Sequence, residues 1–286
     1  MSTTTIRIFQ RRRLLTLAAC LVVCAAAGDR AEGSWVVGSF NQSRGGFDSL
    51  DDPGQADQKA LILFLHPEVT FSSTSTLTSA YLSTVNTMVI GGGFDASHTI
   101  TALSAAEQSA LFQFVSNGGN LAVFTENNNY DLANGDTSRA SLLSPFGLAT
   151  TGWIVNDTAN IVTSPTHPIA LGPGGPLTHF DLHNTGWLTS LGPYAHTIAI
   201  ETATGMPVMA AIERGAISPT SGRAVFLTDS SVFDDGFIYG PVLAANLVGY
   251  LVPEPGLAPQ AALALLGFAT FVGVYRRKAR RVPRRS

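Results

Sequence analysis

The sequence predicts an α/β fold built on a mainly parallel sheet. Residues 87–90 and 120–125 are short apolar runs that are typical of buried strands, and a segment with helical spacing of its apolar residues lies between them. Glycines separate the helix from each strand. A strand, a helix and a second strand in this order form a βαβ unit. Its two strands run parallel because the helix carries the chain back across the sheet.

The helix inside this unit has recognisable signals at both ends. Ser104 is a good N-cap, and Glu107 follows three residues later, which is the spacing of a capping box. Apolar residues at positions 111, 112, 114 and 115 give the helix one apolar face. Asn117, Gly118 and Gly119 follow, as is typical where a helix ends in a left-handed residue. We therefore predict a helix that begins at Ser104 and ends at these glycines.

The other elements of the predicted domain, residues 34–251, follow from the same criteria. Residues 56–65 are apolar on most faces, so they fit either a helix or a buried strand. A polar loop at 126–136 comes after the βαβ unit. The remaining segments are strands at 34–40, 69–72, 161–163, 196–201, 208–212 and 223–228, and helices at 137–143 and 239–251.

Residues 1–27 have the three parts of a secretory signal peptide. Arg11, Arg12 and Arg13 precede an uncharged apolar run from residue 14 to residue 27, and this run ends in three alanines that suit a cleavage site. The arginines and the two leucines after them also fit a twin-arginine signal loosely, so the export route stays open. Either route carries the following domain out of the cytoplasm.

The last 35 residues, 252–286, have three parts in a fixed order. The short motif Val252, Pro253, Glu254 and Pro255 comes first. Residues 256–275 then carry no charge, and 20 residues of helix span about 30 Å, enough to cross the core of a bilayer. A basic cluster follows and would remain cytoplasmic by the positive-inside rule: Arg276, Arg277, Lys278, Arg280 and Arg281.

This three-part tail resembles the PEP-CTERM sorting signal of Gram-negative bacteria. The resemblance implies that an exosortase, a membrane transpeptidase-like enzyme, processes the chain near the Pro-Glu-Pro motif. The protein would then pass from the inner membrane, where its domain faces the periplasm, to the envelope or an extracellular matrix. Its expected partners are the exosortase, the secretion machinery and the membrane before processing. An ordinary single-pass anchor is the alternative.

The charge distribution agrees with two membrane-targeting ends. Residues 34–252 carry 17 acidic and 5 basic residues, while the other basic residues lie in the two ends. A nucleic-acid-binding protein would carry its basic residues on the folded domain, so this class is excluded. Both cysteines, Cys20 and Cys24, lie in the predicted signal peptide. The mature domain therefore has no disulfide, no cysteine nucleophile and no cysteine metal ligand.

Residues 87–148 and 222–251 resemble a class I glutamine amidotransferase-like domain. The resemblance is carried by the strand before Gly91, Gly92 and Gly93, by the capped helix, and by the runs at 142–148, 164–169 and 226–230. It implies a flavodoxin-like three-layer α/β sandwich. Active members carry a cysteine nucleophile on an elbow after the strand that corresponds to residues 120–125.

The residues at that elbow are Glu126, Asn127 and Asn128, and no His-x-Glu pair follows downstream. A carboxylate or an amide cannot replace a thiolate, so the amidotransferase reaction is not expected here. A ligand crevice at the carboxyl ends of the strands remains expected, because open α/β sheets bind ligands there. The residues that we expect to border it are Gly91, Gly92, Gly93, Glu126 and Asp229. Glu126 and Asp229 are weak candidates for catalytic residues, and the sequence offers no strong one.

No cofactor is predicted, although two groups of residues could hold a divalent cation. His179, Asp181 and His183 alternate, so on a strand they would share one face. Asp229, with Asp234 and Asp235 after it, could bind a cation through oxygen atoms or cap backbone amides instead. The other four histidines are isolated in the sequence, so we expect surface or capping roles for His66, His98, His167 and His196.

Together these patterns predict an exported envelope or matrix protein with a non-catalytic binding or structural domain, for which an envelope polysaccharide is one candidate ligand. Two alternatives remain open. The first is a surface hydrolase that uses carboxylate or metal chemistry. The second is an auxiliary subunit of a transporter, which would keep its tail in the membrane.

Overall fold

The computed structural model describes residues 35–46, 49–91, 93–95, 98–130, 133–233 and 240–252. Residues Ser34–Val252 form one compact unit. The predicted signal peptide, the Pro-Glu-Pro motif and the basic cluster lie outside the described residues. Within those residues, every helix is too short or too polar to cross a bilayer.

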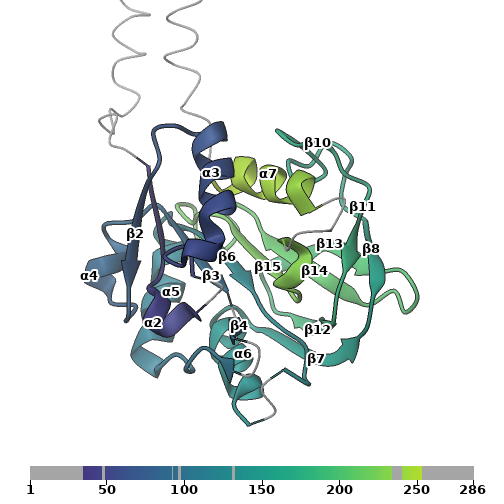
Figure 1. The fold of residues 1–286 in the computed structure, drawn as a ribbon, viewed down its shortest axis with the longest axis horizontal. Helices are drawn as coiled ribbons and strands as arrows, with labels where there is room; N and C mark the ends of the chain where they lie inside the picture. The colour runs from purple at the N-terminus through teal and green to yellow at the C-terminus, as the bar shows by residue number, and fades with distance from the viewer. Residues whose placement is uncertain are drawn as a thin grey trace, which may run out of the picture. The chain divides into compact units, whose positions relative to one another are not determined.

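A nine-stranded sheet runs through the unit (Figure 1). Neighbouring strands are antiparallel from β11 through β14 to β15, and parallel from β15 to β2. The sheet is therefore mixed, with an antiparallel half and a parallel half. The strands follow the order β11 (His179–Leu182), β8 (Asp157–Ile161), β13 (Ala195–Glu201), β14 (Pro207–Ile212), β15 (Ala224–Leu227), β6 (Asn120–Phe124), β3 (Thr87–Gly91), β1 (Val36–Phe40) and β2 (Thr70–Thr74).

The parallel half has a reversal in its strand order. Numbered along the chain, its five strands β1, β2, β3, β6 and β15 stand in the order 2-1-3-4-5. The chain therefore builds outward in one direction from β1 to β2, and in the other direction from β3 onward. Such a point, where connections leave on opposite faces, opens a crevice beyond the carboxyl ends of the two central strands, here β1 and β3.

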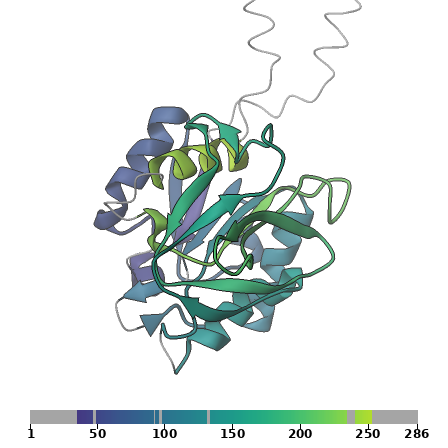
Figure 2. The same cartoon turned by 90° about the vertical axis from the view of Figure 1, so that its right-hand side faces the viewer.

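Helices cover both faces of the sheet (Figures 1 and 2). On β6, Leu121 and Val123 point into one core, whereas Ala122 between them points into the other, as the two-residue period of a strand requires. The first core is shared with α4 (Ser79–Leu82), α5 (Ala105–Ser116) and α6 (Gly135–Leu143). The second core is shared with α7 (Gly240–Leu251), beside which α3 (Ala56–Leu65) packs.

The predicted βαβ unit is confirmed. Ser104 and Glu107 form a complete capping box at the start of α5, and Gly118 after its end has φ +106°. The strands on either side, β3 and β6, pair in parallel with Met88 opposite Leu121. Local signals were sufficient here because the caps, the glycines and the apolar period all agree.

Residues 56–65 form a helix, which settles the choice between helix and strand that the sequence left open. The strand expected at 161–163 is β8, which begins earlier, at Asp157, and ends at Ile161. Its start was missed because residues 157–160 are mostly polar. A separate antiparallel pair of β7 (Leu148–Ile154) and β12 (Thr185–Leu191), which lie far apart along the chain, was not predicted. Short pairs complete the structure: β4 (Gly93–Asp95) with β5 (His98–Thr99), and β9 (Leu171–Gly172) with β10 (Gly175–Pro176).

Candidate functional site

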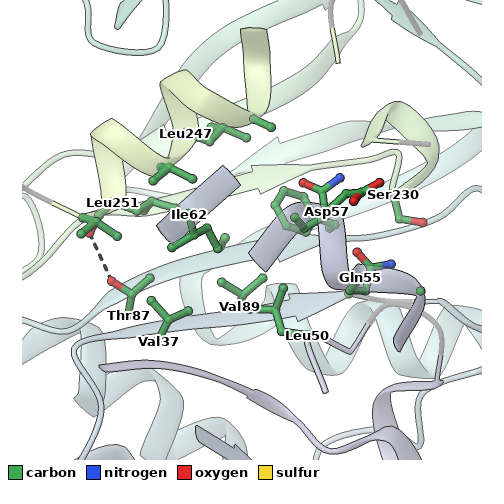
Figure 3. A pocket seen from close by; sticks show the side chains of 18 residues that line it. Val37, Leu50, Gln55, Asp57, Ile62, Thr87, Val89, Ser230, Leu247 and Leu251 are labelled. Carbon is green, nitrogen blue, oxygen red and sulfur yellow. Dashed lines mark hydrogen bonds between the residues drawn. The ribbon is translucent and has the colours of Figure 1, made fainter. Parts of the chain in front are cut away.

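A pocket of about 280 Å³ lies between the sheet and the two helices α3 and α7 (Figure 3). Its floor comes from β1, β3 and β6, so it sits over the reversal in strand order. It extends along the face of the sheet from Thr87, at the start of β3, to Gly91 at the carboxyl end of β3. The crevice in which open α/β sheets bind ligands lies just beyond that end. The volume lies just below the range of ordinary small-molecule pockets, so it suits a small ligand.

The body of the pocket is apolar. Val37 and Val89 line it from the sheet, Ile62 from α3, and Leu247 and Leu251 from α7. At this end of the pocket, a hydrogen bond joins β3 to α7: the Thr87 hydroxyl donates to the carbonyl oxygen of Leu251 over 3.2 Å. An apolar ligand group would thus leave water for an apolar surrounding, the main source of affinity in such sites.

Polar groups gather at the opposite end of the pocket. Gln55, Asp57 and Gln58 come from the start of α3, and Ser230 follows β15 (Figure 3). Gly91, at the carboxyl end of β3, also lines this region. The helical turn before α3 is held in place by Asp52, whose carboxylate accepts the backbone N–H of Gly54 over 2.6 Å. The pocket therefore has an apolar body and a polar mouth.

Of the residues predicted to border the crevice, Glu126 lies nearby but is engaged in the fold. It is 5% exposed. Its carboxylate accepts the backbone N–H of Ser230 over 3.3 Å and also accepts the Ser230 hydroxyl. The group at the elbow position therefore joins the end of β6 to the end of β15.

Asp229 is fully buried and stabilises loops. Its carboxylate accepts the backbone N–H of His183 over 2.6 Å and that of Ser231 over 2.9 Å. Of the two roles predicted for Asp229, cation binding and capping of backbone amides, these contacts favour capping. Gly93 begins β4, while Gly92, Asp234 and Asp235 lie outside the described residues.

The strand placement of the predicted metal ligands is partly confirmed. His179 and Asp181 share the partly exposed face of β11, and Phe180 and Leu182 face the interior. His183 comes after the end of the strand. Within the described part of the chain, a different set brings three possible ligand atoms within 4.8 Å of one another, namely His167, His196 and Glu213.

This histidine–glutamate cluster corrects the expectation that His167 and His196 are isolated. The Nε2 atom of His167 lies 2.9 Å from Oε1 of Glu213, and Nε2 of His196 lies 3.6 Å from the same oxygen. The hydrogen bond with His167 is the main cause that lowers the pKa of Glu213. The spacing of these residues in the sequence does not predict the cluster. His196 lies near Glu213 because it pairs with Ala211 between β13 and β14, two residues before Glu213.

The hydrogen bonds of His167 argue against a metal in this cluster. Its Nδ1 atom accepts the backbone N–H of Ile169 over 3.2 Å, so the ring proton of the neutral form belongs on Nε2. That proton is donated to Glu213. A metal on Nε2 would have to displace this proton while Nδ1 still served as an acceptor, which a neutral imidazole cannot do. The cluster is better explained as a structural contact, in which a hydrogen bond holds the loop with His167 against Glu213 at the end of β14.

No protein-family model matches the chain, and no curated protein does. Solved structures do match. The mmIFT52 N-terminal domain is 14% identical over 78% of this chain and 99% of its own, with a TM-score of 0.55. A ThuA-like protein from Bacteroides uniformis is 12% identical over 80% and 95%, with a TM-score of 0.46. A beta-galactosidase from Bacillus circulans sp. alkalophilus is 11% identical over 78% and 31%, with a TM-score of 0.48. At these identities the similarity concerns the fold alone.

Proposed function

We propose that this protein is an exported envelope or matrix component whose domain binds a small, mainly apolar ligand and does not catalyse a reaction. One observation carries the proposal: a pocket with an apolar body and a polar mouth lies over the reversal between β1 and β3. The carboxylates of Glu126 and Asp229 do not contribute to that pocket's lining.

The strand order supports a flavodoxin-like fold related to the class I amidotransferases. The order 2-1-3-4-5 is that of flavodoxin-like sheets. The antiparallel half beyond β15 is then an extension of this core. With Glu126 at the elbow and hydrogen-bonded to Ser230, the position of the nucleophile is occupied by a structural residue. This contact makes hydrolysis the weaker alternative.

The export part of the proposal depends on the two ends of the chain. The apolar run after three arginines supports secretion, and Val252, Pro253, Glu254 and Pro255 before an uncharged stretch support sorting by an exosortase. In this proposal the domain first faces the periplasm from the inner membrane. Processing then releases it to the envelope or the extracellular matrix.

Ligand binding can be tested by filling the pocket. Val248 lines it from α7, whereas Val242, on the same helix and similarly half-buried, does not. We expect the uncharged fluorescent probe N-phenyl-1-naphthylamine to bind the protein and Val242→Trp saturably, and Val248→Trp weakly or not at all. Equal binding by both variants would show that the probe uses another surface and would contradict the proposal.

Sorting can be tested in a host that has an exosortase. The native protein and a variant with alanines at Pro253, Glu254 and Pro255 are compared by intact mass and by fractionation. We expect the native chain to lose its tail and leave the inner membrane, and the variant to stay. If both chains keep the tail and stay in the membrane, the tail is only an anchor, and the transporter-subunit alternative gains support.

A further inference from the structure

The outward side of α3 is apolar. Phe64 is 83% exposed and Leu63 is 41% exposed, and Ala60 and Pro67 are exposed as well. Positions 60, 63 and 64 follow helical spacing, so they lie along one stripe in the second half of α3, and Pro67 follows two residues after the helix ends at Leu65. The inward residue Ile62 lines the pocket and is buried. The helix is therefore apolar on both sides, which is unusual for a helix at a surface.

The chain leaves the described domain beside this helix. Val252 is 3% exposed and packs in the same small core as Ile62, Val37 and Leu50. Trp35, the first described residue, packs against this core too. Only three residues separate Val252 from the uncharged stretch that begins at Gly256. A fully extended chain of this length reaches at most about 14 Å.

We infer that the stripe formed by Ala60, Leu63 and Phe64 rests on the lipid bilayer while the tail anchors the chain. This inference depends on the proposed function, because it requires residues 256–275 to enter the membrane. The short connection then keeps the α3 side of the domain within reach of the bilayer interface. Burial of Phe64 and Leu63 among the lipid head groups removes apolar surface from water.

The attraction is hydrophobic rather than electrostatic. Residues 34–252 carry 17 acidic and 5 basic residues, so an anionic membrane surface repels the domain as a whole. On α3 itself the charged residues are Asp57 and Lys59, both before the stripe, and the exposed Glu68 follows the helix. Contact with the membrane should therefore not require anionic lipid.

The experiment uses the full chain in vesicles of uncharged phosphatidylcholine, with Cys20 and Cys24 replaced by serine. Phe64→Cys is labelled with an environment-sensitive nitrobenzoxadiazole dye. The control is Val155→Cys, which labels an apolar residue of 51% exposure directly after β7. Figure 1 shows β7 and α3 on opposite sides of the domain. Residues 14–27 are apolar too, so flotation that is lost when the chain ends at Val252 reports insertion of the tail. Spin-labelled phosphatidylcholine reports contact of the dye with lipid.

We expect both labelled chains to float with the vesicles, and only the dye at position 64 to shift to the blue and lose fluorescence to the spin label. Replacement of part of the lipid by phosphatidylserine should not increase the loss. Equal quenching at both positions in floating protein would overturn the inference while leaving the anchor intact. A blue shift that grows with the ratio of protein to lipid, without quenching, would assign the stripe to a second copy of the chain.

If neither chain floats, the anchor itself is wrong, and the inference falls with it. A cooperative urea-unfolding transition of both labelled proteins shows in every case that the domain is folded.

Discussion

At the scale of single residues, Glu107 connects three parts of the chain. Its carboxylate accepts the backbone N–H of Leu77 over 3.1 Å and that of Ser104 over 3.0 Å, and it pairs with the Arg44 guanidinium. Burial alone would raise the pKa of Glu107, but the bonds from Arg44 and from the two backbone amides lower it to about 2. The ionised carboxylate is thus the form that the folded protein prefers.

We expect Glu107→Gln to lower the free energy of unfolding by about 2 kcal/mol at pH 7, because it leaves the Arg44 charge without its buried partner. The folded pKa lies below the ordinary value of 4.5, so this stabilisation is present above pH 4.5 and is lost as the pH falls toward 2. Urea denaturation at several pH values should therefore show the two proteins converge in acid.

The matched control is Glu68→Gln. The side chain of Glu68 is 44% exposed and lies 3.2 Å from His66, so its loss should change the stability at pH 7 by less than about 0.5 kcal/mol. A difference between Glu107→Gln and the native protein that stays constant down to pH 2 would disprove the assigned role of the carboxylate.

Asn246 is a second buried residue with a complete set of partners. Its amide nitrogen donates to the carbonyl oxygens of Ile169 and Gly175 over 2.9 and 3.0 Å, and its oxygen accepts the N–H of Gly174 over 2.9 Å. Asn246→Asp keeps the shape but places a carboxylate against two carbonyl oxygens. We expect a loss of about 3 kcal/mol or more in urea denaturation, whereas Asn160→Asp, at an exposed position, should be nearly neutral.

The residues of the candidate site were predicted only in part. The sequence placed Glu126 and Asp229 near strand ends correctly, because a strand's end follows from its apolar run. It could not show that their carboxylates are used by Ser230, Ser231 and His183, since these bonds depend on how loops meet. The pocket was missed for a different reason: α3, which forms one of its walls, had not been distinguished from a strand.

At the scale of elements, the antiparallel pair of β7 and β12 depends on close packing at one glycine. Gly152 has φ +83°, and a Cβ atom there would lie 1.9 Å from the Trp187 ring. Gly205 has φ +71° with open space around it. Alanine at either site meets the cost of a positive φ, but only Gly152→Ala must also displace Trp187. We expect it to lose about 1–3 kcal/mol more than Gly205→Ala, with altered tryptophan fluorescence.

Similar losses for the two alanine variants would mean that the β7–β12 pair adjusts easily to the added methyl group and that Trp187 is not a fixed part of the core.

The β7–β12 pair also shows why some elements are missed by sequence analysis. Its strands contain register shifts, and β7 mixes threonines, a glycine and an exposed Trp153, so neither a helical nor a two-residue period stands out.

At the scale of the whole molecule, the β3–α5–β6 unit of the parallel half was predictable and the antiparallel half was not. In that unit, caps and glycines mark a strand–helix–strand sequence that fixes the direction of both strands. Beyond β15 the strands are joined by loops, and nothing local states that β13 pairs with both β8 and β14. The order of the sheet therefore depends on long-range packing, which a single sequence shows only through the burial of its strands.

The charge layout leads to a last prediction about the whole chain. The predicted domain is acidic, and seven basic residues follow the uncharged stretch at 256–275. Positive charges resist transfer across the membrane, so the end of the chain should stay in the cytoplasm while residue 252 lies in the periplasm. We expect alkaline phosphatase, which is active only outside the cytoplasm, to be active when fused after Val252 in a host without an exosortase. The same enzyme fused after Ser286 should be inactive, because the intact stretch would hold it inside. Activity in the second fusion would show that residues 256–275 pass through the membrane and do not stop there, and the anchored intermediate on which sorting depends would have to be abandoned.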